Sequence, residues 1–173
     1  MLFRLGAAAA IAAILVVPGS AGAQVLTEKN VSVHMALTIA QTALAECGDR
    51  VSVAVVDRTG RLRVFLQGDG AAPHNIELAR RKAYTAETFG RPTAEWAQRT
   101  DAGPAAAAAA AGNGQNVSGQ RALTDVIPLQ GGVPIKVGEV TIGGVGLSGA
   151  PMGGPQEEAC GKAGIAKVAD QLK

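Results

Sequence analysis

A chain of 173 residues, with 16 Lys and Arg against 14 Asp and Glu, is nearly neutral and has the size of one domain with a single core. The near balance of charge excludes the basic stripe of a nucleic-acid-binding protein and a polybasic membrane patch. Two histidines and two distant cysteines match no zinc or iron–sulfur spacing.

The first 23 residues have the layout of a secretory signal peptide. One positive charge, Arg4, precedes an apolar run over Leu5–Val17, and a triplet of small residues ends at Ala23. The alternative is a membrane anchor, but a span needs about 20 consecutive apolar residues, and Pro18 ends this run early. We therefore expect cleavage after Ala23, a mature domain over residues 24–173, and a periplasmic or secreted location.

Export changes how the two cysteines are interpreted, because oxidising compartments favour disulfides. We expect Cys47 and Cys160 to form one bridge. It would close a long loop and contribute about 2 to 4 kcal/mol in the chain-entropy account. The alternative is two buried free thiols.

The mature chain is expected to begin with a helix and a hairpin. From Thr27, which is placed to cap the helix, apolar residues recur one turn apart up to Ala43, and Gly48 ends the pattern. Val51–Asp57 is almost wholly apolar, as in a strand covered on both faces, whereas Arg61–Gln67 alternates. The turn residues between these two segments predict an antiparallel hairpin.

A second helix is expected over Asn75–Phe89. The next residues predict a short helix that has Thr93 as its N-cap and continues through Trp96. The amino-acid composition changes over residues 101–120, which contain seven consecutive alanines between glycine-rich ends. Seven alanines are too few for a stable isolated helix, so we interpret this segment as a mobile loop rather than a functional one.

Three strands and a helix complete the chain. The strands are Val126–Leu129, Pro134–Val137 and Val140–Leu147, and the helix is Gln156–Leu172. Strands joined by tight turns favour an antiparallel sheet with helices packed against it over alternating βαβ units. The sequence therefore predicts an α/β fold of the α+β kind, with the order α-β-β-α-α-β-β-β-α.

The pattern G-x-G-x-x-G occurs over Gly144–Gly149, but we reject a dinucleotide site there. Such a site needs a strand that leads directly into a helix, and here Pro151 and Pro155 intervene. Two interpretations of the following helix start stay open. Its free N–H groups bind an anionic ligand group, or Glu157 and Glu158 complement the helix dipole.

The two histidines differ in their sequence context. His34 lies inside the first predicted helix and is most simply a surface or packing residue. His74 lies in a glycine- and proline-rich loop just before the second helix, where an imidazole is well placed to meet a cofactor or a metal. An ordinary structural role for His74 is the alternative.

Several motifs together carry a family resemblance. They are V-V-D-x-x-G, D-G-A and R-K-A-Y-T-A within Val51–Phe89, and G-G-V-P-I and G-x-x-G-A-P-x-G-G, followed by E-A-C, within Gly131–Gly164. The chain resembles the GlcG/HbpS-like haem-binding family from about Thr27 to its end. The resemblance implies a five-stranded antiparallel sheet flanked by helices and assembled into a homo-oligomer.

The resemblance also implies a ligand site around the D-G-A and K-A-Y-T-A motifs. The positions carried over from the family are Asp69, Gly70, His74, Lys82 and Thr85. If the ligand is haem, His74 is the candidate axial and metal ligand, because imidazole is a usual ligand of haem iron. Arg81 and Lys82 follow one to two turns later, and a guanidinium fork is well matched to haem propionates.

One departure from the family concerns iron. Some secreted members carry Glu-x-x-Glu in the second helix, a motif linked to iron. Here Glu77 matches the first acid, but Arg80 stands where the second would be. This departure argues against iron binding by the second helix.

Family members include secreted haem or iron binders, domains attached to corrinoid adenosyltransferases, and proteins associated with glycolate use. An exported single-domain chain looks most like the first group. We therefore expect a homo-oligomer that binds haem or a similar tetrapyrrole without turnover, with no nucleic-acid partner and no membrane insertion after cleavage. The alternatives are an enzyme or enzyme accessory that acts on a small carboxylate or a corrinoid, and a structural oligomer without a ligand.

Overall fold

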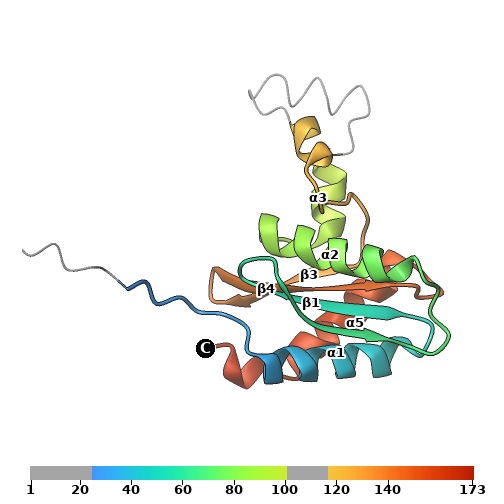
Figure 1. Ribbon diagram of the computed structural model, residues 1–173, viewed down its shortest axis with the longest axis horizontal. Coiled ribbons are helices and arrows are strands. Elements are labelled where there is room, and N and C mark those ends of the chain that lie inside the picture. Colours follow the sequence, from blue (N-terminus) through green and yellow to red (C-terminus); the bar gives the residue numbers. More distant parts are fainter. Residues whose placement is uncertain (1–24, 101–116) are drawn as a thin grey trace, which may run out of the picture.

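A computed structural model describes residues 25–100 and 117–173, which form an antiparallel sheet with helices on both faces (Figure 1). The elements are, in chain order, α1 (Val33–Cys47), β1 (Ser52–Asp57), β2 (Leu62–Gln67), α2 (Asn75–Phe89), α3 (Thr93–Thr100), the 3-10 helix η1 (Val117–Ala122), β3 (Gly132–Val137), β4 (Val140–Ser148), α5 (Gly154–Ala166) and the 3-10 helix η2 (Ala169–Gln171). The predicted signal peptide and most of the predicted loop at 101–120 lie outside the described residues. No helix among the described residues is long and apolar enough to cross a membrane.

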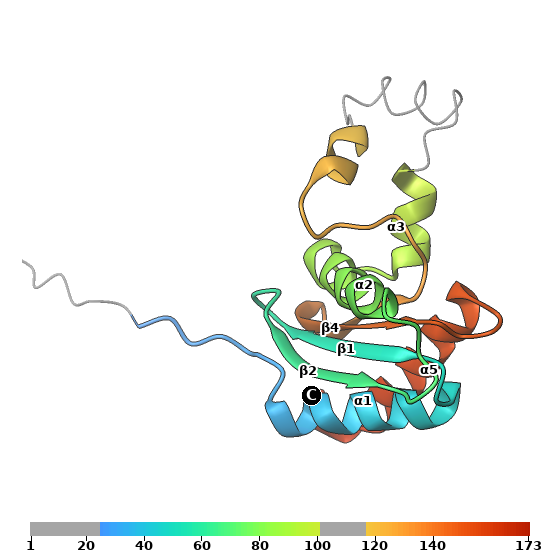
Figure 2. The ribbon, with the colours of Figure 1, turned by 45° about the vertical axis from the view of Figure 1, so that its right-hand side comes forward.

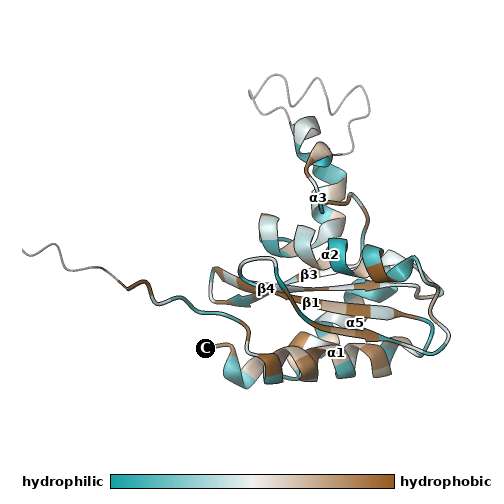
Figure 3. Cartoon of the chain, in the orientation of Figure 1, coloured by the Kyte–Doolittle hydropathy of each residue, from teal (hydrophilic) through white to brown (hydrophobic). Residues whose placement is uncertain are grey.

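The sheet has the strand order β2-β1-β4-β3, with α2 on one face and α1 and α5 on the other (Figure 2). Side chains alternate between the two faces of β1 because a strand has a period of two. Val53 and Val55 join the large core under α1 and α5, while Ala54 and Val56 meet α2 in a smaller cluster. Figure 3 shows brown, hydrophobic segments on the strands and on α1, and more teal on α2.

The hairpin of β1 and β2 confirms the sequence prediction. Val53 pairs with Leu66 on one side of β1 and with Leu147 of β4 on the other. Every residue of β1 is buried, whereas β2 forms an edge of the sheet and is mostly half-buried or exposed. The almost wholly apolar sequence of β1 therefore reflects its place between two strands and two helical layers.

The start of α1 differs from the prediction. The helix begins at Val33, because the Ser32 hydroxyl accepts a hydrogen bond from the Met35 N–H at 3.2 Å and so provides the N-cap. Residues 25–32 have no regular secondary structure, and the Val31 N–H bonds to the Ile142 carbonyl instead. Gly48 ends the helix as expected.

The predicted fifth strand at Val126–Leu129 is wrong, and the sheet has four strands. The backbone of this segment is held by side chains of α2 and not by a neighbouring strand. The Ile127 N–H donates to the Thr85 hydroxyl at 2.9 Å, and the Val126 carbonyl accepts from the Arg81 guanidinium at 2.6 Å. Because side chains of α2 satisfy these backbone groups, the segment does not need hydrogen bonds to a neighbouring strand.

The glycines of β4 serve the packing of α2. A Cβ atom on Gly146 would collide with backbone atoms of Ala79 and Ala83, and one on Gly144 would collide with the Ala83 carbonyl. Glycine therefore lets the helix backbone approach the strand closely. This close approach explains the first two glycines of the G-x-G-x-x-G pattern, whereas the third, Gly149, has a positive φ of 109°.

The bridge between Cys47 and Cys160 is present, with a Cα–Cα distance of 5.9 Å, and confirms the predicted disulfide. It joins the end of α1 to α5 within one helical layer. The final helix is shorter than predicted: α5 ends at Ala166 and is followed by η2. The helix α3 is longer than predicted, and the Thr93 hydroxyl accepts a hydrogen bond from the Gly132 N–H at 2.8 Å, which ties α3 to the start of β3.

Candidate functional site

The loop before α2 holds three of the predicted ligand residues. Asp69, Gly70 and His74 are all exposed. The loop is fixed through its backbone: the Gly68 N–H bonds to the Val51 carbonyl, and the Gly70 N–H bonds to the Asp49 carbonyl, both at 2.9 Å. An exposed loop that is anchored by main-chain bonds can present a side chain in a defined position.

His74 is the N-cap residue of α2, but its side chain makes no capping hydrogen bond. The first helical N–H groups are satisfied by backbone carbonyls instead: Asn75 N–H bonds to Ala72 O, and Ile76 N–H bonds to Pro73 O. The imidazole is therefore not needed to complete the helix start. His34, as predicted, is a surface residue, exposed on α1.

Lys82 has a different environment from the one the sequence suggested. The residue is only 5% exposed, and its ammonium donates to Glu157 Oε2 at 2.6 Å and to the Leu147 carbonyl at 3.0 Å. The other oxygen of Glu157 accepts the N–H groups of Gly149 at 2.9 Å and Ala150 at 3.4 Å. We call this group, Lys82, Glu157 and the three backbone partners, the buried clamp.

The buried clamp joins α2, β4, the loop after β4 and α5. It also explains Gly131 of the G-G-V-P-I motif, because a Cβ atom there would collide with the Glu157 carboxylate and lie 2.9 Å from the Lys82 ammonium. This pair could not be predicted from the sequence, since no local pattern connects two residues that lie 75 positions apart on different helices. The only local signals are that Lys82 belongs to the R-K-A-Y-T-A motif and that Glu157 directly precedes the E-A-C motif.

Side chains in the first turns of α5 accept backbone N–H groups of the segments around the helix start. Glu157 accepts N–H groups of the preceding loop, and the Gln156 side chain accepts the Met152 N–H at 3.0 Å. Glu158 accepts the Ala94 N–H at 3.0 Å and so serves the start of α3. Of the two open interpretations, this arrangement favours the one in which the acids complement the backbone.

Arg81 and Thr85 hold the segment after η1. The Arg81 guanidinium donates to Val126 O, and its Nε is buried without a hydrogen-bond partner among the described residues. The Thr85 hydroxyl donates to the Arg81 carbonyl at 2.8 Å and accepts the Ile127 N–H. Both side chains therefore have structural partners, and their assignment to a ligand site stays a prediction.

Arg80 explains the departure from the Glu-x-x-Glu motif. It forms ion pairs with Glu77 at 2.9 Å and with Asp125 at 2.6 Å. The hydrogen bond with Asp125 is the main reason why the pKa of Arg80 is raised. No group of three or more His, Cys, Asp or Glu residues placed to hold a metal ion occurs in the described part of the chain.

Comparisons with known proteins agree on one family. A family model described as haem degrading protein HbpS-like matches residues 30–166. A double mutant of HbpS from Streptomyces reticuli is 31% identical with a TM-score of 0.72, over 94% of this chain and 99% of that chain. A second HbpS structure is 32% identical with a TM-score of 0.71, over 87% and 98%.

More distant structures share the fold alone. A complex of PduOC with haem is 23% identical with a TM-score of 0.65, over 79% of this chain and 94% of that chain. A Klebsiella pneumoniae protein, ORFY, is 20% identical with a TM-score of 0.69, over 84% and 95%. A search of curated proteins finds no match.

Proposed function

We propose, from the fact that this chain belongs to the HbpS-like family, that it is an exported homo-oligomeric protein that binds haem without degrading it. The family description names haem degradation, which supports haem as the ligand, and a protein of this fold has been crystallised with haem. The observation in this chain that carries the proposal is the exposed His74 imidazole, which the start of α2 does not use.

The residues present fit haem better than a free metal ion. Haem, when bound, would supply an iron that already has four pyrrole nitrogens and takes its further ligand from one protein side chain. A free ion needs several protein ligands, and the described residues offer no such group. His74 would supply the single nitrogen, with Asp69 and Gly70 on the same loop.

The propionates would be met by a smaller set of residues than the motifs suggested. Arg81 is only half-buried and lies seven residues after His74, which places both on one side of α2. Lys82 is tied into the buried clamp and Thr85 is fully buried, so neither is exposed to a ligand at the surface. Arg81 is therefore the propionate partner that we propose.

Export is supported by the disulfide. A bridge between Cys47 and Cys160 persists in oxidising compartments and is rare in the cytosol. Cleavage after Ala23 and the homo-oligomeric state are parts of the same proposal. The intact mass and the native mass of the protein, purified from the compartment in which it accumulates, test both.

Haem titration into the purified apo-protein tests the binding proposal. We expect a Soret band for the wild type, and for His74→Ala a displaced band and an affinity at least about tenfold lower, since axial ligation is lost. His34→Ala is the matched control, because it removes the other histidine, on the opposite face of the sheet, and should leave the titration unchanged. Absence of a Soret band in the wild type would contradict haem binding, and an unchanged band in His74→Ala would remove only His74.

The non-catalytic part is tested separately. The haem complex is incubated in air with ascorbate, and the Soret absorbance is followed. We expect the band to persist and no iron to be released. Loss of the band together with release of iron and an open-chain tetrapyrrole would show that the protein degrades haem.

A further inference from the structure

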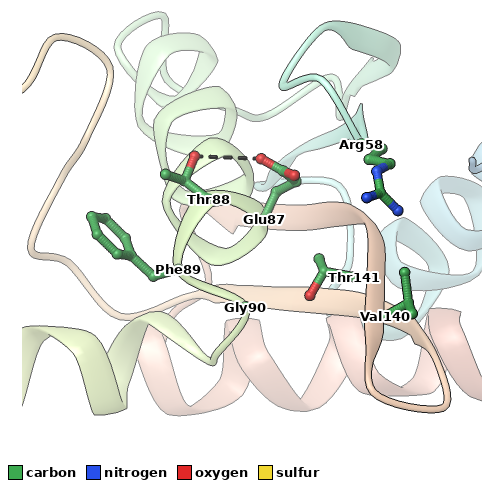
Figure 4. A pocket seen from close by; sticks show the side chains of 7 residues that line it. All are labelled: Arg58, Glu87, Thr88, Phe89, Gly90, Val140 and Thr141. Atoms are coloured by element: carbon green, nitrogen blue, oxygen red, sulfur yellow. Dashed lines mark hydrogen bonds between the residues drawn. The ribbon is translucent and has the colours of Figure 1, made fainter. Parts of the chain in front are cut away.

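A polar cleft of about 490 Å³ lies at the end of the sheet opposite the His74 loop, where α2 ends (Figure 4). Three elements contribute to it. The turn between β1 and β2 provides Arg58, the last turn of α2 provides Glu87 and Thr88, and β4 provides Thr141.

Gly90 ends α2 in a left-handed conformation, with φ of 60°, and a Cβ atom there would lie 3.1 Å from the Thr141 hydroxyl. Glycine at this position thus keeps the floor of the cleft open.

Arg58 is presented by a rigid turn. The Asp57 carboxylate accepts three hydrogen bonds, from the Thr59 N–H at 2.8 Å, the Thr59 hydroxyl at 2.7 Å and the Arg61 N–H at 3.1 Å. The Arg58 N–H itself donates to the Asn30 side chain at 3.0 Å. The Arg58 guanidinium has one exposed partner, Glu28 at 3.5 Å, and an exposed pair of this kind is weak.

Glu87 carries a carboxylate that lacks a cationic partner among the described residues. It is half-buried, and its one hydrogen bond comes from the Thr88 hydroxyl at 3.4 Å. Burial raises the pKa of Glu87, the nearby Asp57 carboxylate adds to this, and Thr88 and Arg58 act in the opposite direction. The last turn of α2 contains no basic residue, and the Arg91 guanidinium that follows it donates to the Phe89 carbonyl at 3.3 Å rather than to Glu87.

We propose that this cleft binds a small zwitterion with an ammonium and a carboxylate group, of the amino-acid class. The ammonium pairs with Glu87 at the end of α2, and the carboxylate pairs with Arg58 at the rim. Figure 4 shows the two charged side chains on opposite sides of the space next to Thr141.

Other ligand classes fit the cleft less well. A simple anion would meet the unpaired Glu87 carboxylate, and a simple cation or metal ion would meet the Arg58 guanidinium. An aromatic ligand between Glu87 and Arg58 would find no ring beside it, because the Phe89 ring points away from both and stacks on Trp96 with ring centroids 4.8 Å apart. A molecule that carries both charges satisfies both side chains at once.

Calorimetric titration of the haem-free protein tests this proposal independently of haem binding. The probes are glycine, β-alanine and γ-aminobutyrate, whose charges are increasingly far apart, with methylammonium and acetate as single-charge controls. We expect at least one of the three zwitterions to bind at least about tenfold more tightly than either control. The same zwitterion should shift the amide resonances of Gly90 and Thr141.

Variants locate the site. Glu87→Gln and Arg58→Ala should each weaken binding at least about tenfold, because each removes one charge partner. Glu46→Gln on α1 and Arg99→Ala on α3 are matched controls on exposed residues away from the cleft and should leave the affinity unchanged. Glu28→Gln removes the competitor for Arg58 and should raise the affinity by up to about fivefold.

Three results would overturn the proposal. The first is that none of the zwitterions binds the wild type. The second is that methylammonium or acetate alone binds as tightly as the best zwitterion. The third is that binding survives Glu87→Gln and Arg58→Ala while both variants keep the wild-type unfolding curve.

Discussion

The start and the middle of α2 carry residues that the same family motifs singled out, yet the two regions are built differently. At the start, His74 is exposed and its side chain caps nothing. In the middle, Lys82 is 5% exposed and bonded to an acid and a carbonyl. Residues that one family resemblance assigns to a ligand site can therefore differ in burial and bonding, and a buried residue with bonded partners, such as Lys82, serves the fold.

The largest effect on the free energy of unfolding is expected for a substitution in the middle of α2. Lys82→Ala leaves the Glu157 carboxylate buried without its cation, which should lower the free energy of unfolding by about 3 to 5 kcal/mol. Urea denaturation measures the change. Lys162→Ala, which removes an exposed lysine 4.0 Å from Glu158, should cost less than about 1 kcal/mol. Equal costs for the two variants would mean that the buried clamp does not stabilise the fold.

A second substitution in the middle of α2 should have an intermediate effect. Thr85→Val keeps the shape of the side chain but leaves the Ile127 N–H without an acceptor, at a cost of about 1 to 3 kcal/mol. Amide hydrogen exchange of Ile127 should also become faster. A normal exchange rate in Thr85→Val would show that Thr85 does not hold this segment.

A smaller effect, which depends on pH, is expected at the end of α2. The pKa of Glu87 is raised in the folded protein, so its contribution to stability is full below the unfolded-state value near 4.5 and is lost as the pH rises through the folded value. Glu87→Gln should therefore be slightly more stable than the wild type at pH 7, by less than about 0.5 kcal/mol after solvent screening, and no more stable at pH 3. Denaturation curves at the two pH values measure the difference, and a loss of stability at pH 7 would contradict the sign.

The smallest effect on stability is expected at the start of α2. His74→Ala removes no capping bond, so the free energy of unfolding should change by less than about 0.5 kcal/mol. The same denaturation experiment as for Lys82→Ala measures it. A loss of more than about 1 kcal/mol would erase the contrast between the two regions and make His74 a structural residue.

Local patterns in the sequence predicted much of the fold. The hairpin of β1 and β2, the bounds of α2 and the end of α1 at Gly48 depend on alternation, helical spacing and glycine, which are all local signals. The disulfide was predicted because only two cysteines are present and export favours their pairing. The order of strands and helices predicted the α+β fold, and the family resemblance implied the same fold, which the comparisons support.

The wrong predictions concern residues whose structure depends on contacts with distant parts of the chain. The segment Val126–Leu129 reads as a strand, but side chains of α2 satisfy its backbone. Lys82 opens the K-A-Y-T-A motif one to two turns after His74 and reads as a ligand-binding cation, but Glu157 of α5, 75 residues later in the chain, pairs with it. Asp69, Gly70 and His74 could be placed on a loop from glycine and proline alone, because a loop is a local feature.

The position of α1 and α5, the two helices that the disulfide joins, has a practical consequence for experiments on the face that carries His74. Both helices lie on the side of the sheet away from α2, and the chain ends next to α1 (Figure 2). A C-terminal affinity tag or surface linker would therefore emerge on the far side. Protein attached to a sensor chip through its last residue would present α2 and the His74 loop to the solution.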